Sequence, residues 1–312
     1  MPAKKAKTFD VFKSEVFYPA IDAALARICT NGRNREPCYT AALAEELPKI
    51  LNDTMDEAAK KTGVPPRYRF GSCYVHQKPY VRFGPGFRFR RELGDLLVLV
   101  KKSINGVDAF NSALFQLKKT DDKPKLIIRA GSGEEEQLTL YTKWGPLEID
   151  LKTERGVVYD ITPHAVSLGG LYMLIRAERK PKFVVAVPDR EMNTKPPPSI
   201  GCYLSDMVKW HCGRTLATKS DVMCNDADDW SKLIWKVIDL LKDAVSKCKG
   251  YGNGSVRRDN GCGSLAFMRD CPELPNFGES ENEDSASNDG TGFGVVFIEE
   301  LDNCSEHREV RR

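Results

Sequence analysis

The stretch RELGDLLVLVKKSINGVDAFNSALFQLKK, residues 91–119, decides the fold expected for this chain. It holds two hydrophobic runs of strand length, joined by a turn-rich segment that contains an Asn-Gly pair. The first run is nearly continuous, which is typical of a strand covered on both faces. Asp95 begins this run, and Gln116 and Lys118 end the second one. A carboxylate, an amide and an ammonium group therefore mark the ends of two predicted strands.

Side-chain alternation predicts which of these groups share a face. On a regular strand, Gln116 and Lys118 point the same way, while Phe115 and Leu117 take the opposite face. If the two strands are neighbours, Asp95 lies beside this pair. Lys119 faces the other way and is a natural control for Lys118.

The three groups suit one kind of chemistry. Asp and Gln oxygens are hard ligands suited to Mg²⁺, for which Mn²⁺ can substitute. A bound Mg²⁺ polarises a phosphoryl oxygen and lowers the pKa of a bound water. Lys118 can hold the attacking water or stabilise charge that develops on the phosphate. The pattern therefore indicates hydrolysis of a phosphodiester.

The remaining sequence predicts a mixed α/β (α+β) domain with a central sheet. Helical spacing is seen over residues 11–30 and 39–66, where Pro48 suggests a kink or a fresh start. Residues 67–84 are expected to form a hairpin or two short strands. Further expected elements are a helix after Ser132, strands near 156–162, 182–188 and 292–300, and an amphipathic, core-packing helix over 228–248.

Asp95 on one strand and Gln116-x-Lys118 on the next resemble the PD-(D/E)xK nuclease superfamily, and more closely its Mrr-type branch, in which Gln replaces the acidic residue of the second motif. The resemblance covers residues 46–144, about a third of the chain. It implies a restriction-endonuclease-like mixed sheet flanked by helices, with an N-terminal helical segment and a C-terminal extension. It also implies metal-dependent cleavage of nucleic acid.

Carried over to this sequence, the resemblance makes Asp95 the main metal ligand, Gln116 the second-motif ligand and Lys118 the catalytic lysine. A glutamate on the preceding helix often completes such sites, and Glu46 is the predicted one. Residues that stand as substitutes or weaker additions are Glu45, Glu92 and Gln137.

Arginines and aromatic residues alternate before Asp95. We expect Arg88, Arg90 and Arg91 to hold phosphates, and Arg88 and Arg90 to share one face of a strand. An edge hairpin with solvated arginines is the competing interpretation. In the same way, Asp95 could follow Gly94 as turn chemistry, and Lys118 could be a solvated lysine at a strand end.

Composition sets the outer limits. The 312 residues are 41% hydrophobic and 29% charged with a net charge of +3, which is ordinary for a globular protein. The sequence contains no run of about 20 apolar residues, so no membrane span is predicted. No secretory signal is recognised at the N-terminus, and a cytoplasmic location is therefore expected. The ten cysteines include no CxxC pair, which favours free thiols over zinc. The sequence contains no GxxxxGK[ST] nucleotide-binding loop, so we predict no ATP motor within this chain.

Three segments are expected: an N-terminal helical segment (1–66), a nuclease-like core (67–190) and a C-terminal extension or specificity region (191–312). The predicted function is a Mg²⁺-dependent nuclease with DNA favoured over RNA, in restriction or antiviral defence. One alternative is a catalytically inactive nucleic-acid-binding protein on the same fold. Another is a protein-interaction domain that uses the acidic loop at 279–289 and the long amphipathic helix. A homo-oligomer and a separate partner protein both stay open.

Overall fold

The computed structural model describes residues 22, 36–63, 66, 68–75, 79–104, 106–120, 125–161, 169–176, 182–193, 198–247, 258–259, 263–264, 266–269 and 292–301. The helix expected over residues 11–30, apart from Asp22, lies outside the described residues. So does the acidic loop at 279–289.

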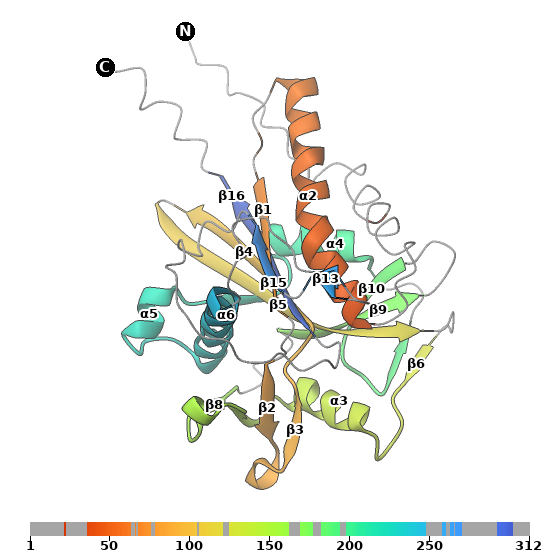
Figure 1. Ribbon diagram of the computed structural model, residues 1–312, viewed down its shortest axis with the longest axis vertical. Coiled ribbons are helices and arrows are strands. Elements are labelled where there is room, and N and C mark those ends of the chain that lie inside the picture. Colours follow the sequence, from red (N-terminus) through yellow and green to blue (C-terminus); the bar gives the residue numbers. More distant parts are fainter. Residues whose placement is uncertain are drawn as a thin grey trace.

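A mixed sheet of eight strands forms the centre of the described structure (Figure 1). Seven strands run in the order β10-β9-β5-β4-β16-β1-β15, and β12 pairs with the first half of β5. Their bounds are β1 (Tyr68–Val75), β4 (Leu96–Ile104), β5 (Val107–Thr120), β9 (Gly170–Arg176), β10 (Lys182–Ala186), β12 (Arg214–Leu216), β15 (Ala266–Arg269) and β16 (Phe293–Glu300). The pairs β5–β9 and β16–β4 are parallel, and the other neighbours are antiparallel.

The two strands of the opening stretch, β4 and β5, are antiparallel neighbours. Their register runs from Leu96 opposite Phe115 to Ile104 opposite Val107. Between Ile104 and Val107, Gly106 has a φ of +79°. This left-handed conformation is accessible to glycine without a steric penalty. The connection is shorter than the sequence predicted, because β5 already begins at Val107.

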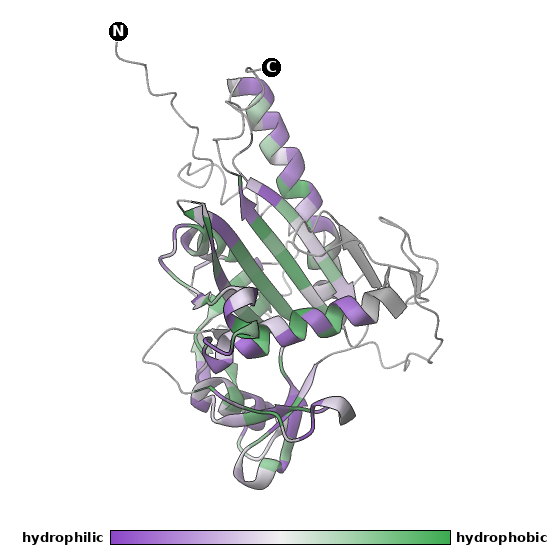
Figure 2. Cartoon of the chain, turned by 90° about the vertical axis from the view of Figure 1, so that its left-hand side faces the viewer, coloured by the Kyte–Doolittle hydropathy of each residue, from purple (hydrophilic) through white to green (hydrophobic). Residues whose placement is uncertain are grey.

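Helices cover both faces of the sheet, and two apolar cores result. Helices α2 (Glu36–Thr62) and α4 (Ile200–Val208) pack on the face that carries Leu96, Val98 and Phe115. Helices α3 (Gly133–Lys143) and α6 (Asp229–Lys247) pack on the face that carries Leu97 and Leu114. Figure 2 shows the hydrophobic strands at the centre of the molecule and the mixed colouring of the helices around them. Strand β4 is thus covered on both faces, as predicted.

A second sheet of four antiparallel strands lies beside the first, in the order β3-β2-β7-β8. Its strands are β2 (Tyr80–Phe83), β3 (Phe89–Glu92), β7 (Pro146–Ile149) and β8 (Val158–Asp160). A short 3₁₀ turn, η2 (Pro85–Phe87), joins β2 to β3. Residues 67–84 do form two strands, but β1 belongs to the main sheet and β2 to the second one. They are therefore not a hairpin.

Strand β16 comes from the C-terminal segment yet lies inside the main sheet. It is parallel to β4 and antiparallel to β1, and its first six residues are buried. The backbone amide of Gly294 donates a hydrogen bond to the carbonyl oxygen of Asp95 at 2.9 Å. The C-terminal segment therefore contributes strands to the same sheet as the predicted core.

The remaining elements complete this arrangement. Helix α2 is assigned as one helix that runs through Pro48 and begins at Glu36. Strand β6 pairs with β11 as a separate two-stranded ribbon. The bounds are β6 (Lys125–Ile127), β11 (Glu191–Asn193), η3 (Lys152–Glu154), α5 (Lys219–Met223), β13 (Arg258–Asp259) and β14 (Gly263–Ser264). The fold class is mixed α/β, as the sequence predicted.

Within the described residues, no helix has both the length and the apolar character that a membrane span requires.

Candidate functional site

Asp95 and Gln116 meet where β4 begins. The backbone amide of Asp95 donates to the carbonyl oxygen of Phe115 at 2.8 Å, which fixes the register at this point. One carboxylate oxygen of Asp95, Oδ2, accepts a hydrogen bond from the amide of Leu117 at 2.7 Å. The same oxygen accepts a hydrogen bond from Nε2 of Gln116. Asp95 is only 1% exposed, so these donors stabilise a buried carboxylate.

The orientation of the Gln116 side chain follows from this contact. An amide turned the other way would place its carbonyl oxygen against the carboxylate oxygen, and two acceptors repel each other. With Nε2 on Asp95, the carbonyl oxygen Oε1 of Gln116 is buried and has no hydrogen-bond partner. A buried acceptor without a partner costs about 1–3 kcal/mol unless water or a ligand occupies it.

Lys118 lies on the same face of β5 as Gln116. Its Nζ atom is 3.8 Å from Oε1 of Glu134, and the Lys118 side chain is 18% exposed. Phe115 and Leu117 belong to the apolar core on the other face. The predicted alternation along β5 is therefore confirmed, and by the same alternation Lys119 faces the α2 side.

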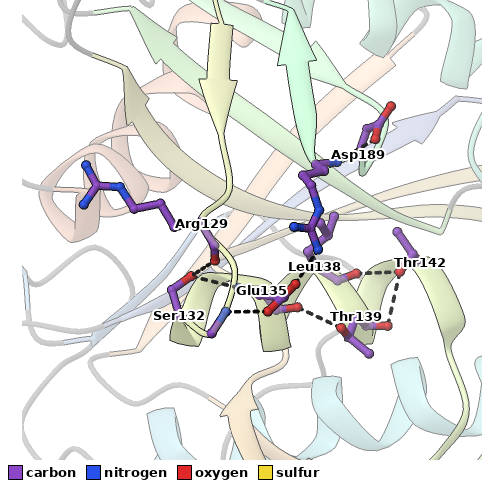
Figure 3. A network of polar contacts seen from close by, with 9 residues as sticks. Arg129, Ser132, Glu135, Leu138, Thr139, Thr142 and Asp189 are labelled. Atoms are coloured by element: carbon purple, nitrogen blue, oxygen red, sulfur yellow. Dashed lines mark hydrogen bonds and ion pairs between the residues drawn. The ribbon is translucent and has the colours of Figure 1, made fainter.

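Helix α3 begins beside this group because its first turn is firmly capped. The Ser132 hydroxyl accepts a hydrogen bond from the amide of Glu135 and donates one to the carbonyl of Arg129 (Figure 3). The Glu135 carboxylate accepts from the amide of Gly131 at 2.6 Å and pairs with Arg190. Ser132 is therefore the N-terminal cap of α3, and the helix predicted to follow it is confirmed.

Gln137 and Tyr141 lie one helical turn apart on α3, and both are buried. The Tyr141 hydroxyl donates to the carbonyl of Leu93 at 2.8 Å, two residues before Asp95. Burial, followed by the nearby charge of Asp95, raises the pKa of Tyr141 well above its usual value. Atom Nε2 of Gln137 has no hydrogen-bond partner. Gln137 is therefore a second buried amide with unsatisfied hydrogen-bonding capacity, on the helix that covers the site.

Tyr172 on β9 is a site residue that sequence reasoning missed. It is the parallel partner of Gln116 in the sheet, and its ring lies 5.6 Å from that of Tyr141. Its hydroxyl is buried and without a hydrogen-bond partner. Burial, followed by the charges of Glu134 and Asp95, raises the pKa of Tyr172. The signal that could have found it is the run GLYMLIR, which has the composition of a buried strand.

The glutamates proposed to complete the site come from different places. Glu46 and Glu45 lie on α2. This helix packs on one face of the sheet, whereas Leu97 and Leu114 belong to the other face. Glu92 ends β3, where the hydroxyl of Tyr80 donates to its carboxylate at 3.4 Å. The role of Glu46 as a metal ligand stays a prediction.

The three arginines predicted to bind nucleic acid differ in their surroundings. Arg90 pairs with Asp150 and lies over the ring of Tyr80. Arg91 pairs with Glu136 at 2.6 Å and donates to the carbonyl of Gly133 at 3.1 Å. Both are thus engaged in holding β3 against its neighbours.

Arg88 immediately precedes β3 and is exposed, with its guanidinium 4.6 Å from the centre of the Phe89 ring. Of the three predicted arginines, it is the one whose surroundings best suit contact with a phosphate.

The donor set fits a hard divalent cation bound by few protein ligands. Mg²⁺ is commonly held by one or two carboxylates and keeps several waters. Asp95 supplies a buried carboxylate, and Oε1 of Gln116 is an orphaned oxygen directly beside it. Within the described part of the chain, no three His, Cys, Asp or Glu side chains gather as a metal cluster. A site here would therefore depend on an amide oxygen as well as on carboxylates.

No protein-family model, curated protein or solved structure matched this chain in the comparisons.

Proposed function

We propose that this protein is a metal-dependent nuclease that hydrolyses phosphodiester bonds, with DNA as the preferred substrate. The observation that carries the proposal is the contact between Asp95 and Gln116, which leaves a buried carbonyl oxygen without a partner beside a buried carboxylate. Lys118 extends from the same face of the same strand. The resemblance of Asp95 and Gln116-x-Lys118 to PD-(D/E)xK nucleases supports the same assignment.

Each residue then has a distinct role. Asp95 and Gln116 would hold Mg²⁺ or Mn²⁺ through Oδ and Oε1 atoms, with a glutamate as a further ligand. The metal would supply Lewis-acid activation of the phosphate and of a bound water. The Lys118 ammonium would orient the attacking water and stabilise negative charge on the phosphate oxygens. Arg88 would contact the phosphate backbone.

The test is cleavage of plasmid and linear DNA with Mg²⁺, Mn²⁺ or EDTA. Asp95→Asn and Lys118→Ala are expected to lower the rate by at least about 100-fold, because each removes a group acting in the transition state. Lys119→Ala is the matched control one residue along, and it should cut like the wild-type protein. Metal-independent cutting, or equal rates for the Lys118 and Lys119 variants, would contradict the assignment.

A catalytically inactive nucleic-acid-binding protein is the second candidate. The observation in its favour is that Gln116 stands where a second carboxylate would hold a metal more strongly. Binding of DNA that is insensitive to EDTA, with no cleavage by the wild-type protein, would favour it.

The structure removes one of the two features that favoured a protein-interaction domain, namely the long amphipathic helix. The apolar face of α6, with Trp230, Leu233, Ile234 and Val237, is buried against the sheet and is not available to a partner.

A further inference from the structure

The first turn of α3 carries three consecutive glutamates, and two of them are held by arginines. Glu135 pairs with Arg190, and Glu136 pairs with Arg91 at 2.6 Å. Glu134 instead faces Lys118 on the central sheet. Glu134 therefore has a distinct position among the three acids.

The contact between Glu134 and Lys118 is loose. The two charged atoms are 3.8 Å apart, and a charge-assisted hydrogen bond would bring them to about 2.7–2.9 Å. A carboxylate has about four lone-pair positions, so Glu134 keeps acceptor capacity for another ligand. Its side chain is 44% exposed, which leaves it reachable from solvent.

Two orphaned polar atoms lie on the same side of the sheet. Oε1 of Gln116 and the Tyr172 hydroxyl are both buried without hydrogen-bond partners, on directly paired residues of β5 and β9. Burial, followed by the charges of Glu134 and Asp95, raises the pKa of the Tyr172 hydroxyl. Asp95 contacts Gln116, and Glu134 contacts Lys118 two residues further along β5, so these groups lie at neighbouring positions on the α3 side of the sheet.

We propose that Glu134 supplies the second carboxylate of the metal site, opposite Asp95 and Gln116, in the place that sequence analysis gave to Glu46. This inference rests on the proposed nuclease function and names one of its ligands. The arrangement gives a divalent cation one deep carboxylate, one amide oxygen and one open carboxylate. Glu46, by contrast, belongs to a helix on the opposite face of the sheet.

The test is Mn²⁺ binding measured by isothermal titration calorimetry without nucleic acid, so the readout does not depend on cleavage. We expect Glu134→Gln to weaken Mn²⁺ binding by about tenfold or more, because loss of even an outer-shell partner of a metal ligand typically costs about 10–100-fold in affinity. Glu46→Gln tests the rival ligand, and Glu136→Gln tests whether loosening the helix start is enough. Both should bind within about twofold of wild type. Circular dichroism should confirm that every variant is folded.

Lys118 requires its own control, because Glu134→Gln also leaves the lysine charge without this carboxylate. The substitution is therefore repeated in a Lys118→Ala background, where the same loss of Mn²⁺ affinity is expected. A loss seen only when Lys118 is present would overturn the proposal.

Two other outcomes would overturn the proposal and remain distinguishable. Normal binding by Glu134→Gln, with loss in Glu46→Gln, would return the ligand to α2 and leave the nuclease function standing. Absence of Mn²⁺ binding by the wild-type protein would overturn this inference together with the metal-dependent function.

Discussion

The nitrogen and the oxygen of the Gln116 side-chain amide have different surroundings. Nε2 stabilises the buried Asp95 carboxylate, while Oε1 is left buried and without a partner. A carboxylate at this position would place two buried negative charges side by side, which raises the free-energy cost of the unliganded fold. Glutamine avoids that repulsion but contributes less to cation binding. Such a site needs a second carboxylate from elsewhere, which is the place that we assign to Glu134.

Tyr172 gives a prediction that separates stability from function. Removing a buried hydroxyl that has no partner should raise the free energy of unfolding, so Tyr172→Phe is expected to be more stable by about 1 kcal/mol. If the hydroxyl donates to a bound water or phosphate, DNA cleavage should fall by about tenfold at the same time, since 1.4 kcal/mol of lost stabilisation is a factor of ten. Urea unfolding and cleavage rates measure the two effects.

Tyr141→Phe is the matched control for this prediction. The Tyr141 hydroxyl donates to the carbonyl of Leu93, and its removal leaves that carbonyl without this donor. Tyr141→Phe should therefore be less stable, by about 1 kcal/mol or more. A Tyr172→Phe protein that is destabilised and fully active would show that its hydroxyl has a structural role instead.

At the scale of single residues, the sequence predicts the side-chain positions that follow from alternation along a strand, and few others. Asp95, Gln116 and Lys118 could be placed on one face because the side-chain period of a strand is two residues. Tyr172 and Glu134 could not be found in that way. Their approach to the site depends on the parallel pairing of β9 with β5 and on the position of α3, and both are long-range features.

At the scale of elements, the start of α3 decides where Glu134 lies. The Ser132 hydroxyl caps the helix, and Glu135 ties the first turn to the backbone of Gly131 and to Arg190 (Figure 3). These contacts hold the first turn where Glu134 reaches Lys118 of β5. The position of Glu134 therefore depends on a few polar contacts outside the apolar core.

We expect Ser132→Ala to lower the free energy of unfolding by about 1 kcal/mol, because one amide of the first turn loses its acceptor. Fraying of this turn should also weaken Mn²⁺ binding. Thr218→Ala is a matched control, since Thr218 caps α5 with the same kind of contact to Asp221, on a helix that contributes no site residue. It should lose similar stability and keep its Mn²⁺ affinity. Equal Mn²⁺ affinities in the two variants would show that the capped turn does not position a ligand.

Local patterns predicted most of these elements and failed where partners are distant. The cap at Ser132 and the apolar face of α6 depend on neighbours within one or two helical turns. The sequence left a hairpin and two short strands open over residues 67–84, and it could not decide between them because β1 finds its partners at β15 and β16, more than 190 positions along the chain. A sequence pattern holds no information about such partners.

Across the whole molecule, the site lies where strands from distant segments are brought together. Strand β16 sits between β1 and β4, and it holds the backbone of Asp95 through Gly294. The position of Asp95, immediately before β4, thus depends on the C-terminal strand. The unfolding of the main sheet should consequently be one cooperative event that includes the site, and buried site residues should report on it.

Buried tyrosines make that unfolding sensitive to alkaline pH. Burial raises the pKa of Tyr141 and Tyr172, and it raises the pKa of Tyr159 to about 12. In the unfolded chain a tyrosine ionises near pH 10. Above about pH 10, the unfolded state therefore binds fewer protons than the folded state, and stability falls as pH rises. Below about pH 10, both states keep these protons and the contribution is constant.

We expect the free energy of unfolding to be nearly constant from pH 8 to 9.5 with respect to these groups, and to fall above about pH 10 by up to about 1.4 kcal/mol per tyrosine per pH unit. Urea unfolding at several pH values measures the loss, and tyrosinate absorbance of the folded protein measures ionisation directly. Tyr172→Phe should show a shallower fall, because it lacks one of the protected hydroxyls. If the folded protein titrates all its tyrosines near pH 10 with no loss of stability, the β4–β5–β9 face is open to water and the buried site described above does not exist in solution.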